Sequence, residues 1–300
     1  MEKEVSIERP NYSFCEYAGD FCDQELKEDL TLDVFFIYPS EPKHLAVTVS
    51  EAVRNLKEIS SEDRYKSWED LAVGGHIIFC EICKAIKSAK LIVANITTLN
   101  FNVLFELGYA IGIHKTILPI RDITMTKDKK LFDKIGIIDT LGYNNFTNSK
   151  ELVKMVNEHK EFFPPINERP KIDRKQPIYY ISGPIDTDGS MRLQSCLNKG
   201  YFPFRVFDVR EITRLSLHEA YKQTMSSISV VAHLMDPARD GSNSHNARAA
   251  FVCGMALAAG KHVLMLQEGF TKQPIDYRDI IIPYDEPRNI DIICTTNLLD

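Results

Sequence analysis

The sequence predicts an α/β protein made of two domains in tandem. Its 300 residues are about twice the roughly 150 residues of an ordinary domain. In both halves, short apolar runs alternate with stretches of helical periodicity, which is the pattern of a mostly parallel sheet with helices on both faces. The order of these elements in the first half is repeated in the second, so we interpret the chain as a duplication.

The first half begins with a strand and continues with alternating helices and strands. Strands are predicted at 34–38, 91–94 and 116–120. The run at 91–94 is apolar throughout, as expected for a strand covered on both faces. The spacing of apolar residues predicts helices over 45–59, 76–88 and 103–113. Helical patterning near 150–158 is expected to cap this domain.

The second half repeats this layout. Strands are predicted at 178–181, 205–207, 229–232 and 262–266, and helices over 190–199, 217–226 and 247–259. Gly108 aligns with Gly254, a shift of 146 positions, whereas Ala94 aligns with Ala232, a shift of 138. We therefore expect the loop between these two elements to be eight residues longer in the second half.

Composition shifts mark the domain boundaries. Residues 1–30 form an acidic extension, 31–160 the first domain and 177–300 the second. Prolines and charges dominate 161–176, which makes this segment a linker rather than a helix or strand. The fold class is thus two flavodoxin- or Rossmann-like domains with mostly parallel sheets.

The composition also excludes several classes of partner. Apolar residues make up 44% of the chain and charged residues 26%, as in a globular protein. No apolar run approaches the roughly 20 residues that span a bilayer, and the charged N-terminus does not resemble a signal peptide. We therefore expect a cytoplasmic protein without a membrane partner. The net charge of -6 argues against broad nucleic-acid binding.

Seven cysteines are an odd number, and in a cytoplasmic protein we expect them to be reduced. Cys80 and Cys83 are interpreted as core thiols. A four-thiolate zinc site with Cys15 and Cys22 is the alternative. We predict no metal and no cofactor.

Ligands of such folds bind at the carboxyl ends of the strands. Four polar stretches fall there, at 38–40, 95–102, 182–184 and 236–246. In the second stretch, Glu106 follows the polar turn by one helical turn and lies among apolar residues. The helix dipole favours its ionised form, whereas desolvation opposes it. We interpret Glu106 as a functional carboxylate; the alternative is a partner for the first-turn amides or for Lys115.

A motif in the first half resembles the signature of nucleoside 2-deoxyribosyltransferases and of TIR-like nucleotide-binding proteins. In that motif an Asn-x-x-x-Glu-Leu-Gly-x-Ala helix leads to a Lys-x-hydrophobic strand. The matching residues are Asn102, Glu106, Leu107, Gly108, Ala110 and Lys115. The run Ile-Tyr-Tyr-Ile-Ser-Gly-Pro-Ile at 178–185 resembles the first strand and turn of the same transferases. The resemblance covers about 90 residues in each half.

The resemblance implies that Glu106 is the catalytic carboxylate, which attacks or stabilises the anomeric carbon of a sugar. Breaking an N-glycosidic bond produces an oxocarbenium-like centre, and a neighbouring carboxylate can add to it or stabilise its charge. No residue is evident as a distinct general acid. The expected substrate-binding residues lie at the strand ends: Tyr38, Ser40, Asn95, Thr97, Asn100 and Asn102.

The second half departs from this pattern because Val252 stands in the position of Glu106. We expect this domain to bind, sense or complete the first site. The residues 242–248 are expected to precede a helix and could bind an anion through its first amides and Arg248. A solvated loop is the alternative. The candidate binding residues are Ser182, Gly183, Asp240, Asn246 and Arg248.

The sequence therefore predicts an enzyme that cleaves or transfers the N-glycosidic bond of a nucleoside, a nucleotide or NAD. For a phosphate-bearing substrate, Arg121 is the nearest cation to the motif, and Arg248 would reach it only if the two halves face each other. Two alternatives stay open: a non-catalytic nucleotide sensor, and a structural or partner-binding protein. Association into a homo-oligomer also stays open.

Overall fold

The computed structural model describes most of the two predicted domains. The described residues are 14–15, 20–21, 32–60, 64–74, 76–125, 135–159, 164–168, 170–200, 203–208, 210, 214–271, 274 and 277–298. Apart from a two-stranded pairing of β1 (Phe14–Cys15) with β2 (Asp20–Phe21), the predicted extension at 1–30 lies outside these ranges.

The first domain is built on a five-stranded parallel sheet. Its strands are β3 (Leu32–Ile37), β4 (Tyr65–Ser67), β5 (Ala89–Asn95), β6 (Thr116–Asp122) and β7 (Asn144–Phe146). Their order across the sheet is β4-β3-β5-β6-β7, and each neighbouring pair is parallel. The sequence analysis did not predict β4 and β7, which are three-residue strands at the two edges.

The second domain has the same sheet. Its strands are β8 (Ile178–Ile181), β9 (Phe204–Phe207), β10 (Ser229–Leu234), β11 (His262–Glu268) and β12 (Ile281–Tyr284). Their order is β12-β11-β10-β8-β9, again with parallel neighbours. Numbered within each domain, both sheets read 2-1-3-4-5, which is the flavodoxin-like order. The predicted fold class is confirmed.

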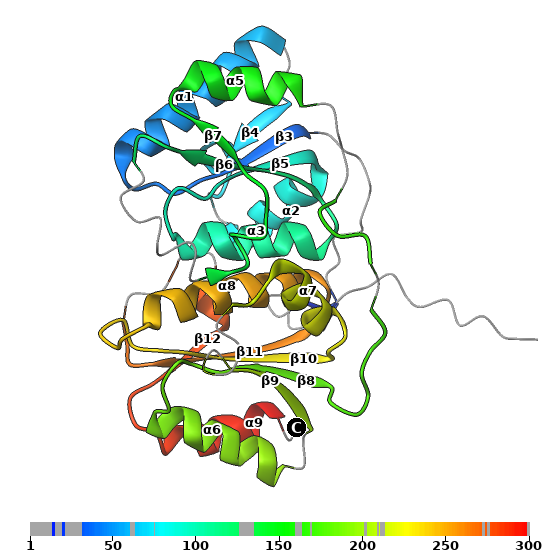
Figure 1. The fold of residues 1–300 in the computed structure, drawn as a ribbon, viewed down its shortest axis with the longest axis vertical. Helices are drawn as coiled ribbons and strands as arrows, with labels where there is room; N and C mark the ends of the chain where they lie inside the picture. Colours follow the sequence, from blue (N-terminus) through cyan, green and yellow to red (C-terminus); the bar gives the residue numbers. More distant parts are fainter. Residues whose placement is uncertain are drawn as a thin grey trace, which may run out of the picture.

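Helices cover both faces of each sheet and divide the molecule into six layers (Figure 1). In the first domain these are α1 (Lys43–Ser60), α2 (Ile78–Ser88), α3 (Phe101–Gly112) and α5 (Ser149–Glu158). In the second they are α6 (Asp188–Lys199), α7 (Leu217–Met225), α8 (Ser242–Ala258) and α9 (Asn289–Leu298). Short 3-10 helices lie at Trp68–Asp70 and Arg278–Ile280. Within the described ranges, no helix combines the length and apolarity that a membrane span requires.

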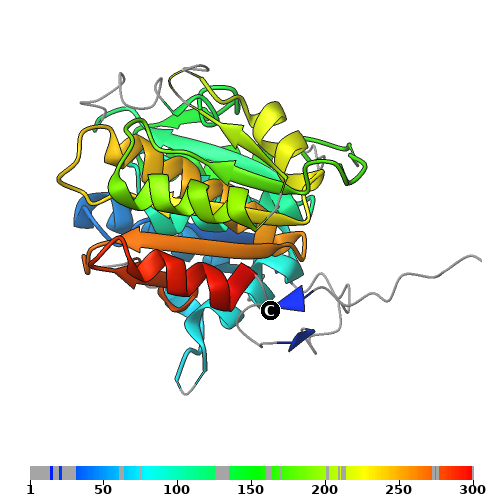
Figure 2. The same ribbon diagram turned by 90° about the horizontal axis from the view of Figure 1, so that it is seen from below.

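Strand alternation explains the layers. In β3, Phe35 and Ile37 face the centre of the molecule, whereas Val34 and Phe36 face α1 and α5. The central layers of both domains, which contain α2, α3, α7 and α8, share one continuous apolar core. The helices α6 and α9 cover the outer face of the second sheet, and Figure 2 looks onto this layer.

The two domains pack through α3 and α8, which lie against each other at the centre of Figure 1. A Cβ atom on Gly108 would lie 2.0 Å from the carbonyl oxygen of Phe251, and one on Gly254 would lie 2.0 Å from that of Phe105. The aligned glycines therefore make equivalent backbone contacts. Gly112, one turn further, approaches Met255 in the next turn of α8, so the helices run in the same direction. The helices α3 and α8 each run antiparallel to the strands of their own sheet. Since the two helices run in the same direction, the carboxyl ends of the strands in both sheets lie on the same side of the molecule.

One expectation about the second half was wrong. The helix that was predicted to begin near Ala247 begins at Ser242, after Gly241 in the left-handed region at φ 74°. The loop between β10 and α8 is therefore 235–241, compared with 96–100 in the first domain, and most of the extra length is helix. The first turns of this helix are polar in sequence and therefore resembled a loop. The side chains of His245 and Asn246 form hydrogen bonds with the backbone of His233 and Met235 at the end of β10.

Candidate functional site

The carboxyl edge of the first sheet is closed by a polar turn between β5 and α3. The Oδ1 atom of Asn95 accepts a hydrogen bond from the amide of Thr97 at 3.0 Å. The hydroxyl of Thr97 in turn accepts one from the amide of Asp122 at 2.8 Å, which ties the turn to the end of β6. Two predicted substrate-binding side chains thus hold the turn in shape. Thr97 has only one side-chain oxygen, so its capacity for a ligand is limited.

Asn100 also has a structural role. It is the N-cap of α3, and its Oδ1 atom accepts a hydrogen bond from the amide of Val103 at 3.1 Å. Such a bond satisfies one of the helix's otherwise unpaired amides and fixes where the helix begins. Asn100 therefore positions α3, and with it the residues of the next turns.

Tyr38 and Ser40 follow β3 but lie in different surroundings. Tyr38 is buried, its hydroxyl lies 3.4 Å from that of Ser67, and its ring packs against Trp68 with the centroids 5.9 Å apart. Burial, the largest cause, raises the pKa of the Tyr38 hydroxyl. Ser40 is exposed. The structure does not bring these two residues together around one ligand position.

Glu106 lies in the second turn of α3 and is only 5% exposed. Asn102 is one turn before it on the same helix, at the i, i+4 spacing that places side chains on one face. An ionised carboxylate is costly to bury unless hydrogen bonds or charges compensate it. Glu106 is thus a buried acidic residue on the helix that follows the carboxyl end of β5.

Three polar atoms around the same turn lack hydrogen-bond partners among the described residues. They are Nδ2 of Asn95, Oγ1 of Thr98 and Oδ1 of Asn102, and all three are shielded from solvent. The great majority of buried polar atoms in native proteins have a partner, so each exception needs a cause such as water, an ion or a ligand. Thr98 was not among the expected binding residues, because sequence position does not reveal which polar groups remain unsatisfied.

Arg121, which the sequence places nearest to the motif, is the sixth residue of β6 and is buried. Its Nη1 atom donates to the hydroxyl of Tyr143 at 3.2 Å, and the guanidinium lies 5.5 Å from the centre of that ring. The guanidinium is therefore engaged within its own domain, and a phosphate group would have to compete with Tyr143.

In the second domain, the run at 242–248 does not precede a helix, as was expected, but forms the first two turns of α8. The side chain of Asn246 accepts from the amide of Met235 and donates to its carbonyl oxygen, both at 2.9 Å. Arg248 is buried, and its Nε atom donates to the carbonyl oxygen of Ile135 in the first domain at 3.3 Å. The predicted start of the helix was therefore wrong, whereas anion binding by its first amides stays a prediction. Arg248 does reach across to the first domain, as the sequence analysis required of facing halves.

The carboxyl edge of the second sheet is filled by its own side chains. His233, which aligns with Asn95, lies 2.5 Å from the Tyr284 hydroxyl through its Nε2 atom, and the His245 imidazole donates to the His233 carbonyl oxygen at 2.7 Å. Burial, the largest cause, lowers the pKa of both imidazoles to about 4. A Cβ on Gly189 would lie 2.0 Å from the Tyr284 hydroxyl, which shows how closely α6 covers this pair.

The remaining candidates of the second domain show no convergence on a ligand position. Ser182 is buried. A Cβ on Gly183 would lie 3.0 Å from the sulfur of Met235, so that side chain occupies the space beside the turn. Asp240 is exposed, and Val252, in the position of Glu106, is fully buried in the central core.

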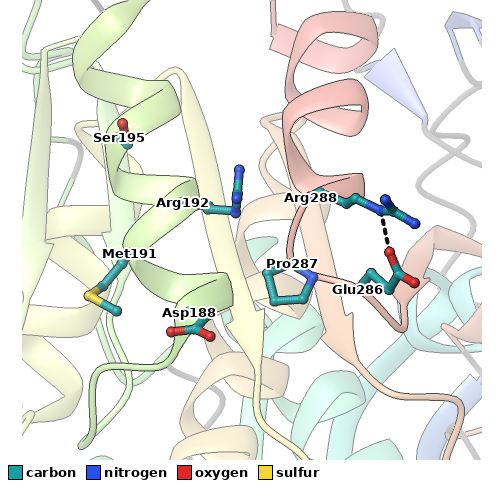
Figure 3. A pocket seen from close by; sticks show the side chains of 7 residues that line it. All are labelled: Asp188, Met191, Arg192, Ser195, Glu286, Pro287 and Arg288. Atoms are coloured by element: carbon teal, nitrogen blue, oxygen red, sulfur yellow. Dashed lines mark ion pairs between the residues drawn. The ribbon is translucent and has the colours of Figure 1, made fainter.

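An open hollow of about 700 Å³ lies on the outer side of this edge, between α6 and the loop before α9 (Figure 3). Its lining residues are Asp188, Met191, Arg192, Ser195, Glu286, Pro287 and Arg288. Arg288 pairs with Glu286, as the dashed line in Figure 3 marks. Arg192 pairs with Asp291 of α9 at 2.6 Å. Each arginine of the hollow thus has an acidic partner, Glu286 within the lining and Asp291 outside it.

Metal ligation finds little support in the described ranges, where no three His, Cys, Asp or Glu side chains gather as a metal site requires. Cys83 packs in the central core, and Cys22, a member of the alternative zinc site, lies outside the described residues.

In comparisons with known proteins, no protein-family model matches the chain, and no curated protein matches it.

Proposed function

We propose that the carboxyl edge of the first domain binds a nucleoside, a nucleotide or NAD, and that Glu106 takes part in cleaving or transferring its N-glycosidic bond. The observation that carries this proposal is the burial of Glu106 one helical turn beyond Asn102, in a segment where Asn95, Thr98 and Asn102 each have one unsatisfied polar atom. A sugar hydroxyl both donates and accepts hydrogen bonds, so it can satisfy an amide nitrogen, a hydroxyl and an amide oxygen of this kind.

The chemistry follows from the carboxylate. Departure of the base leaves positive charge at the anomeric carbon, and a carboxylate held nearby either adds to that carbon or stabilises the charge. The buried surroundings strengthen this electrostatic interaction relative to water. Transfer to a second base and hydrolysis by water share this first step, so the site is compatible with a transferase or a hydrolase.

A non-catalytic nucleotide sensor is the second candidate, and the second domain favours it. That domain has the same sheet but carries Val252 in place of the carboxylate, and its strand ends are occupied by the His233–Tyr284 pair. A protein that only binds its ligand needs no carboxylate at either edge.

Incubation of the full chain with separate nucleosides, nucleotides and NAD distinguishes the two. Chromatography would detect a released or exchanged base, and isothermal calorimetry would detect binding. We expect base release from at least one compound. Tight binding without any cleavage would replace the enzyme by the sensor. Neither binding nor cleavage across the panel would refute both.

A further inference from the structure

Two cysteines that are far apart in the sequence meet in the outer layer of the second domain. Cys196 lies in α6 and Cys294 in α9, and both helices pack on the same outer core. Asp291 of α9 connects the helices: its carboxylate accepts a hydrogen bond from Arg192 at 2.6 Å and contacts the Cys196 sulfur at 3.5 Å. This places the turn of α9 that follows Asp291 directly against Cys196.

Cys294 occupies that following turn, three residues after Asp291, on the same face of α9. Cys196 packs against the apolar cluster that contains Cys294, and the two thiols are close enough for each to shift the pKa of the other. Cys294 is 4% exposed, whereas Cys196 is only partly buried. A reagent from solvent therefore reaches Cys196 first, and Cys294 is positioned behind it.

We propose that Cys196 and Cys294 form a reversible disulfide site that closes on exposure to a peroxide and joins α6 to α9. A disulfide has a sulfur–sulfur bond of about 2.05 Å, so the two side chains must move closer from their reduced positions between α6 and α9. The ion pair between Arg192 and Asp291 holds the two helices in register while this occurs.

The reaction balances with peroxide as the only oxidant. The Cys196 thiolate attacks one peroxide oxygen, the O–O bond breaks, and water leaves after proton uptake, which gives a sulfenic acid. The Cys294 sulfur then attacks the Cys196 sulfur, the S–O bond breaks, and a second water leaves. Two thiols are oxidised to one disulfide while one peroxide is reduced to two waters.

The surroundings set the rate of this reaction. Burial, the largest cause, raises the pKa of both thiols, to about 12 for Cys294, and Asp291 contributes in the same direction. Lys199, on the same helix, opposes the shift at Cys196. Since the thiolate is the reactive form, the pair is expected to stay reduced until an oxidant is abundant.

A bond at this position has a structural consequence. Met191, Arg192 and Ser195 line the hollow of Figure 3 from the same helix that carries Cys196. Covalent attachment of α6 to α9 would fix that wall. The inference concerns the second domain alone and is independent of the chemistry proposed for Glu106.

Mass spectrometry of the full chain tests the proposal. The protein is treated with excess hydrogen peroxide, remaining thiols are alkylated, and the digest is analysed without reductant. We expect a peptide pair joined through Cys196 and Cys294, lighter by two hydrogen atoms than the separate peptides and released by dithiothreitol. Cys83→Ser, which removes a buried thiol from the other domain, should leave the joined pair unchanged.

Cys196→Ser and Cys294→Ala should each abolish the joined pair, and circular dichroism would confirm that the variants are folded. If Cys294→Ala does not fold, the partly exposed Cys196→Ser still provides the test. Peroxide-treated wild type that carries sulfinic or sulfonic acid at Cys196 without the cross-link would overturn the proposal. So would complete alkylation of both cysteines after peroxide treatment, or a cross-link that joins either one to a different cysteine.

Discussion

At the scale of single residues, the candidate site is defined by polar groups that the fold buries without satisfying them. Asn95 at the end of β5, Thr98 in the following turn and Asn102 in the first turn of α3 each carry such an atom, and Glu106 lies one helical turn beyond Asn102. An unsatisfied buried group costs about 1 to 3 kcal/mol. Natural proteins retain such destabilising groups mainly at functional sites, so several unsatisfied polar groups at one strand end indicate a function there.

The unsatisfied hydroxyl of Thr98 predicts the effect of Thr98→Val, which replaces that hydroxyl by a methyl group of similar size. Because the Thr98 hydroxyl has no hydrogen-bond partner in the described part of the chain, we expect the free energy of unfolding to rise or stay within about 1 kcal/mol. Ligand affinity should fall at the same time. Urea unfolding and calorimetry measure the two quantities. A loss of stability well above 1 kcal/mol with unchanged affinity would contradict this role.

The buried imidazoles of the second domain predict how stability depends on pH. The pKa of His233 and His245 is about 4 in the folded protein, against about 6.5 in the unfolded chain. As the pH falls from 6.5 towards 4, the unfolded chain binds protons that the folded protein does not. The free energy of unfolding therefore falls through this window, by on the order of 3 kcal/mol for each histidine.

His245→Gln removes one titrating group but keeps a nitrogen donor for the His233 carbonyl oxygen. We expect the variant to lose less stability than wild type between pH 7 and pH 5, as measured by urea unfolding at each pH. Equal losses in both proteins would show that His245 does not titrate as its burial implies.

At the scale of elements, most of the fold could be predicted from apolar periodicity, and the exceptions have physical causes. The central strands β3, β5, β10 and β11 are long apolar runs, whereas β4 and β7 are short edge strands with little apolar signal. The first turn of α8 was missed because His245 and Asn246 are polar, yet both form hydrogen bonds to the end of β10. Tertiary contacts of this kind leave no periodic pattern.

The crossing of α3 and α8 predicts that Gly108→Ala is destabilising. Alanine normally stabilises a helix relative to glycine, by about 1 kcal/mol. Here the added Cβ would lie 2.0 Å from a backbone oxygen of Phe251, so the helices must separate. We expect the free energy of unfolding to fall by at least about 1 to 3 kcal/mol.

Gly142→Ala is the matched control, because a Cβ there would meet nothing within 4 Å. The two variants are compared by urea unfolding. If Gly108→Ala were as stable as Gly142→Ala, the close contact of the two helices would not exist as described.

At the scale of the whole molecule, the duplication was predicted from sequence, but the mode of packing was not. Gly108 and Gly254 could be aligned because they share a motif, yet nothing in that motif indicates that the two helices touch each other. The structure shows the contact, and it shows that segments of each domain reach the other. Thr140 accepts a hydrogen bond from the amide of Leu217, and Tyr277 stacks on Phe105 with ring centres 4.3 Å apart.

Because the domains pack in this way, the carboxyl edges of both sheets lie on one side of the molecule. The side chains found at the two edges differ. The first edge has the buried Glu106 and three unsatisfied polar atoms, whereas the second is occupied by His233, Tyr284 and Met235 and has one such atom, Nδ1 of His233. Glu106 could be chosen as a candidate from sequence because carboxylates are rare in apolar helices. The closure of the second edge could not, because it depends on side chains from three separate strands and loops.

If Glu106 acts on an N-glycosidic bond, removal of its charge slows the release of the base. The rate of base release from the compound that wild type cleaves is compared with that of Glu106→Gln, which keeps the shape and removes the charge. Glu158→Gln, at an exposed position on α5, is the matched control and should retain the wild-type rate. We predict that Glu106→Gln loses on the order of 10²- to 10⁴-fold in kcat while its circular dichroism spectrum stays unchanged. Base release by folded Glu106→Gln at near the wild-type rate would contradict the account.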